Sequence, residues 1–396
     1  MEPIVSHVAV LLVFTLGIFR ALLLDWARSK ARNGWGNALA ATLALCAVVM
    51  SPPIAAAGGL AMVADDAGDR VIVFDADSDT VLGTVDVGVG TVGDCSISDG
   101  QDLGFVTAFD SSVWVIDLQA SPPVLASGTN PIPISNTGVD TALTPDGRFL
   151  LVCGTGLHGG TVSVVDVAAR TEVDSFDPGH GCSTVEVCDD GSVLIAFQDI
   201  TNNVRIVRRL TIDIAGNLSD TGTTFFPDFP GNLACAPGAA TAVVFELGGD
   251  AQSFTVPGLT SVDSVNIFPG FAVGGQVGPR GDRLYAQGSD GSTGIVKAYD
   301  YNSVVGTIGD VSLFEIPVSG TSGGTGLDRL ALHPSGSKLY VSEPGAVDVY
   351  DAFTGGFLTS ITDPDIVSPT GLCFSSKIFV DGFESGNTLA WSNQQP

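Results

Sequence analysis

Basic residues are scarce in this chain of 396 residues, which has 16 Lys and Arg against 43 Asp and Glu and a formal net charge of −27. The first 57 residues hold four of the bases and two of the acids, so the remainder carries 41 acids and 12 bases. Such a surface repels a phosphate backbone and argues against nucleic acid as a partner. Calcium, a cationic ligand or simple solubility outside the cell all fit, and solubility is the simplest explanation.

Two further patterns are missing. Helical periodicity does not continue beyond residue 60, where short runs rich in Val, Ile and Phe alternate with Gly, Asp and Asn. The chain also has no Cys-x-x-Cys-His haem site and no phosphate-binding loop. We therefore expect an all-β protein without a cofactor. Its 50 Gly and 21 Pro supply many turns, and its 45% hydrophobic composition supplies a large core.

The amino terminus holds two apolar segments. Residues 8–24 are slightly short for the roughly 20 residues that cross a bilayer. A basic stretch, an apolar core over residues 37–50 and a small-residue end follow, which is the order of a secretory signal peptide with cleavage after Ala57. We interpret residues 1–57 as a signal peptide or a membrane-anchor region, and expect membrane contact only through it, if it stays uncleaved. Residues 1–27 then precede the signal peptide. Either the true translation start lies downstream of Met1 and these residues are not translated, or residues 8–24 form a first membrane helix.

Export would place the cysteines in an oxidising compartment. An even number remains after cleavage and permits disulfides in any of fifteen connectivities, with buried free thiols as the alternative. The remaining cysteines are Cys95, Cys153, Cys182, Cys188, Cys235 and Cys373. Cys182 and Cys188 cannot bond to each other if they lie on one extended strand, because six residues span about 20 Å.

A repeat organises the rest of the chain. Residues 143–177 contain an apolar run, a Pro-Asp-Gly turn, a second run, a Gly-rich loop, a third run that ends in Asp, and a fourth run after a short turn. In the turn, Pro presets φ and Gly supplies the residue with positive φ. The order is that of a four-stranded antiparallel sheet. The Asp that ends the third run recurs at Asp75, Asp117, Asp166, Asp300 and Asp351.

The copies can be counted. Complete ones begin near residues 92, 138, 182, 231, 271 and 326. The region before residue 90 supplies only three strands, and its missing first strand is found at residues 370–375. Four-stranded repeats of about 40 to 50 residues predict a β-propeller, and a blade shared by both chain ends closes its ring. We therefore predict a seven-bladed β-propeller over residues 58–375, with Leu372 close to Met62.

Three of these copies resemble a known repeat. Residues 68–88, 143–177 and 332–341 are similar to the YVTN-type β-propeller repeat. That family includes surface-layer proteins, and its fold is similar to that of lactonases and quinoprotein subunits, so the resemblance implies a fold more than a chemistry. Residues 376–396 resemble an Asp-Gly-Phe-Glu-Ser-Gly…Trp-Ser tail found at the carboxyl ends of exported bacterial proteins. We expect this tail to pack on the shared blade or, alternatively, to be presented to a sorting or surface partner.

Ligand-binding residues are predicted on one rim of the ring. His158 and His180 stand between glycines in loops of neighbouring blades, where a ligand can approach the backbone. Asp140 and Asp328 are expected near the mouth of the central channel. Two His and a carboxylate could hold a metal, although no spacing in the sequence requires one.

A calcium loop is a weaker hypothesis. Asp75, Asp77 and Asp79 alternate as in the first half of an EF-hand loop, but Thr80 stands where the sharp turn of that loop needs Gly. An acidic hairpin turn explains this stretch better.

The resemblance to lactonases would imply Arg, His and Glu in the channel, and the inner strands offer Glu186, Arg329 and His333. His333 occupies a position that other copies fill with Thr144 or Cys188. We therefore favour a secreted, periplasmic or surface-exposed module that binds a ligand or a cell-surface partner without catalysis. A lactonase-like hydrolase and a structural surface-layer component are the alternatives.

Overall fold

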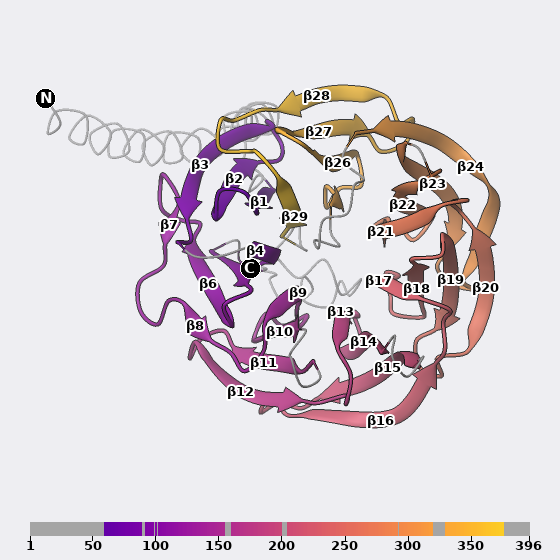
Figure 1. The fold of residues 1–396 in the computed structure, drawn as a ribbon, viewed down its shortest axis with the longest axis horizontal. Coiled ribbons are helices and arrows are strands. Elements are labelled where there is room, and N and C mark those ends of the chain that lie inside the picture. The colour runs from indigo at the N-terminus through magenta and orange to yellow at the C-terminus, as the bar shows by residue number, and fades with distance from the viewer. Residues whose placement is uncertain are drawn as a thin grey trace, which may run out of the picture. The chain divides into compact units, whose positions relative to one another are not determined.

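The structure is a computed structural model that describes residues 59–88, 92–98, 100, 102–154, 160–199, 204–291, 293–319 and 329–375. In these ranges the secondary structure consists of strands and turns without a helix, so no described helix could cross a membrane. Seven antiparallel sheets form a ring, which confirms the predicted seven-bladed β-propeller (Figure 1). The predictions for residues 1–57 and 376–396 lie outside the described residues.

We number the blades 1 to 7 in chain order and give their strands from the channel outwards. Blade 1 consists of β4 (Val92–Ile97), β5 (Leu103–Ala108), β6 (Ser112–Asp117), β7 (Val124–Leu125) and β8 (Ile132–Pro133), and blade 2 of β9 (Gly138–Leu143), β10 (Phe149–Gly154), β11 (Val162–Asp166) and β12 (Thr171–Phe176). Blade 3 consists of β13 (Cys182–Val187), β14 (Ser192–Asp199), β15 (Val204–Ile212) and β16 (Leu218–Phe225), and blade 4 of β17 (Pro230–Cys235), β18 (Thr241–Glu246), β19 (Asp250–Thr255) and β20 (Ser261–Asn266).

Blades 5 to 7 follow the same order. Blade 5 consists of β21 (Phe271–Val277), β22 (Arg283–Ser289), β23 (Gly294–Asn302) and β24 (Thr307–Val318), and blade 6 of β25 (Leu330–Leu332), β26 (Lys338–Glu343), β27 (Ala346–Asp351) and β28 (Phe357–Ile361). Blade 7 consists of β29 (Pro369–Phe374), β1 (Leu60–Asp65), β2 (Arg70–Asp75) and β3 (Thr80–Asp86).

Blade 7 joins the two ends of the ring. Its innermost strand β29 comes from the end of the repeat region and pairs with β1 from its start (Figure 1). Leu372 lies opposite Val63, and Cys373 lies opposite Met62. The predicted contact between these two parts of the chain is therefore confirmed.

Blade 1 departs from the regular pattern at its outer edge. Its fourth strand is divided into β7 and β8, which both pair with β6. The Asn130 side chain fills the gap, because its Oδ1 accepts the Val115 N–H at 2.9 Å and its Nδ2 donates to the Val115 carbonyl at 2.6 Å. The side-chain amide thus provides the acceptor for the Val115 N–H and shares the Val115 carbonyl with the backbone N–H of Ala126.

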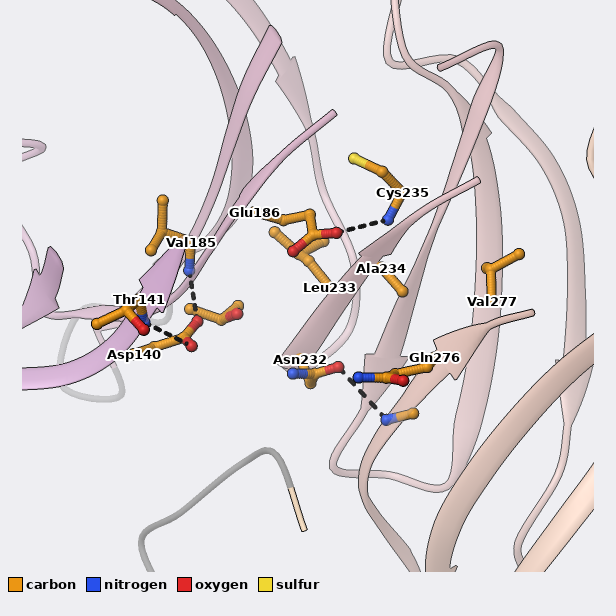
Figure 2. A pocket seen from close by; sticks show the side chains of 12 residues that line it. Asp140, Thr141, Val185, Glu186, Asn232, Leu233, Ala234, Cys235, Gln276 and Val277 are labelled. Carbon is orange, nitrogen blue, oxygen red and sulfur yellow. Dashed lines mark hydrogen bonds between the residues drawn. The ribbon is translucent and has the colours of Figure 1, made fainter. Parts of the chain in front are cut away.

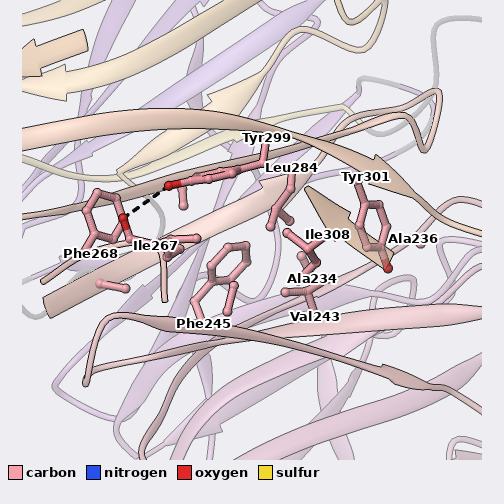
Figure 3. Close-up of a cluster of buried hydrophobic side chains, with 13 residues drawn as sticks. Ala234, Ala236, Val243, Phe245, Ile267, Phe268, Leu284, Tyr299, Tyr301 and Ile308 are labelled. Atoms are coloured by element: carbon pink, nitrogen blue, oxygen red, sulfur yellow. Dashed lines mark hydrogen bonds between the residues drawn. The ribbon is translucent and has the colours of Figure 1, made fainter. Parts of the chain in front are cut away.

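The hydrophobic core lies between the blades. Between blades 4 and 5, Phe245 packs with Leu284, Tyr299 and Tyr301 in one buried cluster (Figure 3). The Tyr299 hydroxyl donates to the Ile267 carbonyl at 3.3 Å, so the ring is buried while its polar end is satisfied. Burial of each such aromatic side chain contributes about 2 kcal/mol, and similar clusters line the other junctions.

In four blades the Asp that ends the third strand caps the next turn. Asp166 accepts the Ala169 N–H at 2.7 Å, and Asp351 accepts the Thr354 N–H at 2.8 Å. The predicted marker Asp300 is wrong for this role, because β23 continues to Asn302, whose Oδ1 accepts the Val304 N–H at 3.1 Å. In blade 3, where the sequence lacked a marker, Asp213 takes this role after the nine-residue strand β15.

All six described cysteines form disulfides, and each disulfide joins neighbouring blades. Cys95–Cys373 connects blades 1 and 7, Cys153–Cys182 connects blades 2 and 3, and Cys188–Cys235 connects blades 3 and 4. Cys182 and Cys188 do not bond to each other, as their spacing predicted. The first disulfide spans 278 residues and stabilises ring closure covalently.

We predict that the Cys95→Ser/Cys373→Ser variant unfolds at a lower temperature than the Cys153→Ser/Cys182→Ser variant. The two disulfides close segments of 278 and 29 residues, and the chain-entropy model gives the longer one about 2 kcal/mol more stabilisation. Thermal unfolding followed by circular dichroism measures the difference. An equal or smaller loss for the ring-closing pair would mean that β29–β1 pairing alone holds the ring.

Candidate functional site

The innermost strands of the blades surround the centre of the ring, which we call the channel, and each of them is paired within its blade on one side only (Figure 1). An edge strand exposes backbone N–H groups that need acceptors. Here the acceptors are side chains of the preceding blade. Asp94 Oδ2 accepts the Thr141 N–H at 3.2 Å, and Asp140 Oδ2 accepts the Val185 N–H at 2.7 Å.

The same arrangement continues around the ring. Asn232 Oδ1 accepts the Gly275 N–H at 3.4 Å, and Glu186 Oε1 accepts the Cys235 N–H at 3.2 Å. Gln276 Oε1 accepts the Leu332 N–H at 3.0 Å. We call Asp94, Asp140, Glu186, Asn232 and Gln276 the latch residues, because each ties its blade to the next.

Four of the latch residues line a cavity of about 130 Å³ in the channel wall, formed by blades 2 to 5. Figure 2 shows the bonds from Val185 to Asp140 and from Cys235 to Glu186 on this wall. The lining consists of Asp140, Thr141, Thr184, Val185, Glu186, Asn232, Leu233, Ala234, Cys235, Gly275, Gln276 and Val277. It is therefore a polar site built from side chains that the fold already holds in place.

Burial dominates the electrostatics of Asp140. The side chain is only 2% exposed, and its burial raises the pKa of the carboxyl group, while hydrogen bonds from Thr184 and from the Val185 backbone act in the opposite direction. Asp140 is thus held by donors on the next blade. Asp140 therefore has two roles, since it ties blade 2 to blade 3 and also forms part of the cavity wall.

The predicted binding set is not brought together in the part of the chain that the structure describes. Asp140 lines the cavity, whereas His180 lies in the loop before β13 and stacks on Phe197, with the two ring centroids 5.8 Å apart. His158 and Asp328 lie outside the described residues.

The predicted lactonase set is also divided. Glu186 lines the cavity, but Arg329 and His333 do not. Burial lowers the pKa of Arg329, and the nearby charges of Asp66 and Glu343 partly offset this. His333 is at the turn end of its blade, where its Nδ1 lies 2.6 Å from Ser335 Oγ.

Asp77, which belongs to the calcium hypothesis, is instead found beside this histidine. His333 Nε2 lies 3.3 Å from Asp77 Oδ1. Asp75 accepts the Ser78 N–H at 2.8 Å, and Asp79 accepts the Lys338 ammonium at 2.7 Å and the Tyr340 hydroxyl at 2.6 Å. The three carboxylates thus have separate partners, in a hairpin turn that contacts blade 6.

Four polar side chains of the cavity were not predicted from the sequence, namely Thr141, Thr184, Asn232 and Gln276. Thr184 and Asn232 stand four residues before the turn of their copies, at the position that Asp140 has in blade 2. Polar side chains that recur at one position of an otherwise apolar inner strand are the pattern that could have identified them.

Further acids at the ends of second strands hold the loops that enter the blades. Asp65 Oδ2 accepts the N–H groups of Val367 and Ser368, each at 2.6 Å. Glu246 accepts those of Asp228 and Phe229. Glu246 is 3% exposed, and burial together with the charge of Asp228 raises its pKa to about 7.

Comparison with known proteins supports the fold. No family model matches the sequence, and no curated protein matches it significantly. A functionally unknown protein from Desulfotomaculum acetoxidans superposes with a TM-score of 0.67 at 19% identity, over 80% of this chain and 98% of that one. Candidate 6-phosphogluconolactonases from Bacteroides uniformis and Bacteroides fragilis give TM-scores of 0.64 and 0.63, both at 14% identity. They cover 80% and 82% of this chain and 99% of their own. At such identities the likeness shows the fold alone.

We predict that a Glu246→Gln variant gains stability relative to the parent as the pH rises from about 5 to 8. Because the pKa of Glu246 is raised in the folded state, its protonated form favours folding. That contribution is fully present below about pH 4.5 and is lost as the pH rises through about 7, by on the order of 2 kcal/mol. Thermal unfolding across this pH range measures the difference between the two proteins.

Glu315→Gln is the matched control. Its hydrogen bond with Lys297 lowers the pKa of Glu315, so that its contribution is lost only as the pH falls below the range tested. The control should show a constant difference from the parent between pH 5 and 8. A constant difference for Glu246→Gln as well would contradict the assignment of a raised pKa to Glu246.

Proposed function

We propose that the protein is an exported β-propeller that binds a small ligand or a cell-surface partner and has no catalytic activity. The composition of the cavity carries this proposal. Its described lining includes no His, Lys, Arg or Ser, and its one cysteine, Cys235, is held in a disulfide. Nucleophilic and general-base chemistry often uses such side chains. The two carboxyl groups that could replace them, those of Asp140 and Glu186, already accept backbone N–H groups of the next blade.

The latch bonds support a binding role. Asp140, Glu186, Asn232 and Gln276 each accept a backbone N–H group from the neighbouring blade. Their side chains are therefore ordered before any ligand arrives, which lowers the entropic cost of binding. A site of this kind is preorganised for recognition.

Export is supported by the cysteines. Three disulfides between blades suit an oxidising compartment and would not persist in a reducing cytosol. The order of basic, apolar and small residues before residue 58, and the resemblance of three copies to the YVTN-type repeat, agree with a secreted, periplasmic or surface-exposed bacterial protein.

A lactonase-like hydrolase is the second candidate. Two structurally similar proteins are candidate 6-phosphogluconolactonases, and Ser335, His333 and Asp77 follow one another in contact at the turn face of blades 6 and 7. Against it, a phosphorylated lactone is an anion, and a chain with 41 acids and 12 bases after residue 57 would repel it.

We predict that the purified mature chain hydrolyses no lactone above the buffer rate. The test panel contains δ-gluconolactone, 6-phosphogluconolactone and an acyl-homoserine lactone, and proton release reports the reaction. Hydrolysis that is lost in Glu186→Ala and Arg329→Ala would establish a channel hydrolase, whereas loss in Ser335→Ala and His333→Ala would place the activity at the turn face. Either result would overturn the proposal.

We also predict that the protein recovered outside the cytoplasm begins at residue 58 and has no free thiol. Intact-mass spectrometry with and without thiol alkylation measures both properties. Recovery of the chain in the cytosol with six reactive thiols would refute export. Tight association with the cell envelope after cleavage would favour a structural surface-layer component instead of a soluble binding module.

A further inference from the structure

We propose that the channel cavity binds a small organic cation with several N–H donors, such as a protonated linear diamine. This inference rests on the proposed binding function and specifies its ligand class. It follows from what the latch residues leave exposed on the channel wall.

The latch bonds consume hydrogen-bond donors. The edge N–H groups of Val185, Cys235 and Gly275 are each taken by a side-chain oxygen of the preceding blade. In an extended strand, the N–H and the carbonyl of one residue point to the same side. The carbonyl groups of these residues therefore face the channel too, and all three residues line the cavity. These three carbonyl groups are thus oriented as acceptors while the paired N–H groups are occupied, and a ligand that matches them carries donors.

Charge favours a cation over a neutral donor. Glu186 supplies a carboxylate to the lining, Asp140 adds a buried carboxyl group, and no described lining residue is basic. The surplus of acids in the chain after residue 57 extends the negative electrostatic potential beyond the cavity. A concave site lined by charge of one sign concentrates ligands of the opposite sign. An anionic ligand would be repelled at the same site.

The chemistry of the lining favours an ammonium group over a metal ion. The described residues contain no group of three or more His, Cys, Asp or Glu that could hold a metal. An ammonium has three N–H donors and can satisfy them with carbonyl and amide oxygens that carry no full charge. The volume of about 130 Å³ is well below that of sites for drug-sized ligands, so the ligand is small.

The experiment is a calorimetric titration of the mature chain with 1,3-diaminopropane at low ionic strength. Propane-1,3-diol has the same heavy-atom skeleton without charge, and calcium chloride provides a metal cation. We expect the diamine to bind and the diol to bind at least tenfold more weakly. We also expect the affinity for the diamine to fall at high salt. Equal binding of diol and diamine, or binding of calcium alone, would overturn the inference.

Two variants test the cavity in opposite directions. Glu186→Gln keeps an acceptor for the Cys235 N–H and removes the charge, so the diamine should bind about tenfold more weakly. Gln276→Glu keeps an acceptor for the Leu332 N–H and adds a charge, so the diamine should bind about tenfold more tightly. Asp310→Asn, on the exposed outer strand β24, removes the same charge as Glu186→Gln and should change the affinity less than twofold.

Failure of this inference differs from failure of the proposed function. If diamine binding is absent, or is unchanged in both cavity variants while their thermal unfolding matches the parent, the cation assignment is wrong. Lactone hydrolysis measured on the same samples is the separate readout. Activity that is lost in Glu186→Gln would overturn the binding function itself.

Discussion

The ring depends on the backbone N–H groups that its innermost strands expose to the channel. Closure of the ring does not pair the inner edge of any blade, because each innermost strand is still hydrogen-bonded to a neighbouring strand on one side only. The latch residues solve this by reaching from one blade to the next, as Asp94 does to Thr141 and Gln276 to Leu332. An unsatisfied buried N–H costs about 1–3 kcal/mol. Polar residues in the channel therefore serve stability before they serve any ligand.

Most of the fold could be predicted because its determinants are local and repeated. A Pro-Asp-Gly turn or an Asp that caps a hairpin acts through bonds to residues two to five positions away, as Thr144 and Asp166 do. The shared blade could be predicted because one copy lacked a strand and the chain end supplied one. Asp300 was assigned wrongly because β23 is nine residues long and pairs with the long strand β24, so that its end depends on its neighbour in the sheet as well as on its own sequence.

The site was less predictable because it is made by contacts between blades. Asp140 was named for its expected place at the channel mouth, yet its partner Val185 lies 45 residues away in the chain. Asp77 and His333 were assigned to different hypotheses, and the structure places them 3.3 Å apart across the junction of blades 6 and 7. The spacing of residues within one repeat cannot predict a contact between two different blades.

The junctions between blades are secured by different bonds in different parts of the ring. Disulfides hold junctions 7–1, 2–3 and 3–4. In three of the other junctions, 4–5, 5–6 and 6–7, a buried tyrosine bonds across instead, namely Tyr301 to Thr241, Tyr285 to the Ala352 carbonyl and Tyr340 to the Ala76 carbonyl. Among the described residues, junction 1–2 has neither device, and there the Thr141 N–H and hydroxyl both donate to Asp94. Junction 3–4 has a disulfide and a latch bond at one residue, because the sulfur of Cys235 bonds to Cys188 and its N–H donates to Glu186. The residue that orients the Glu186 carboxyl group is thus itself held covalently to the neighbouring blade.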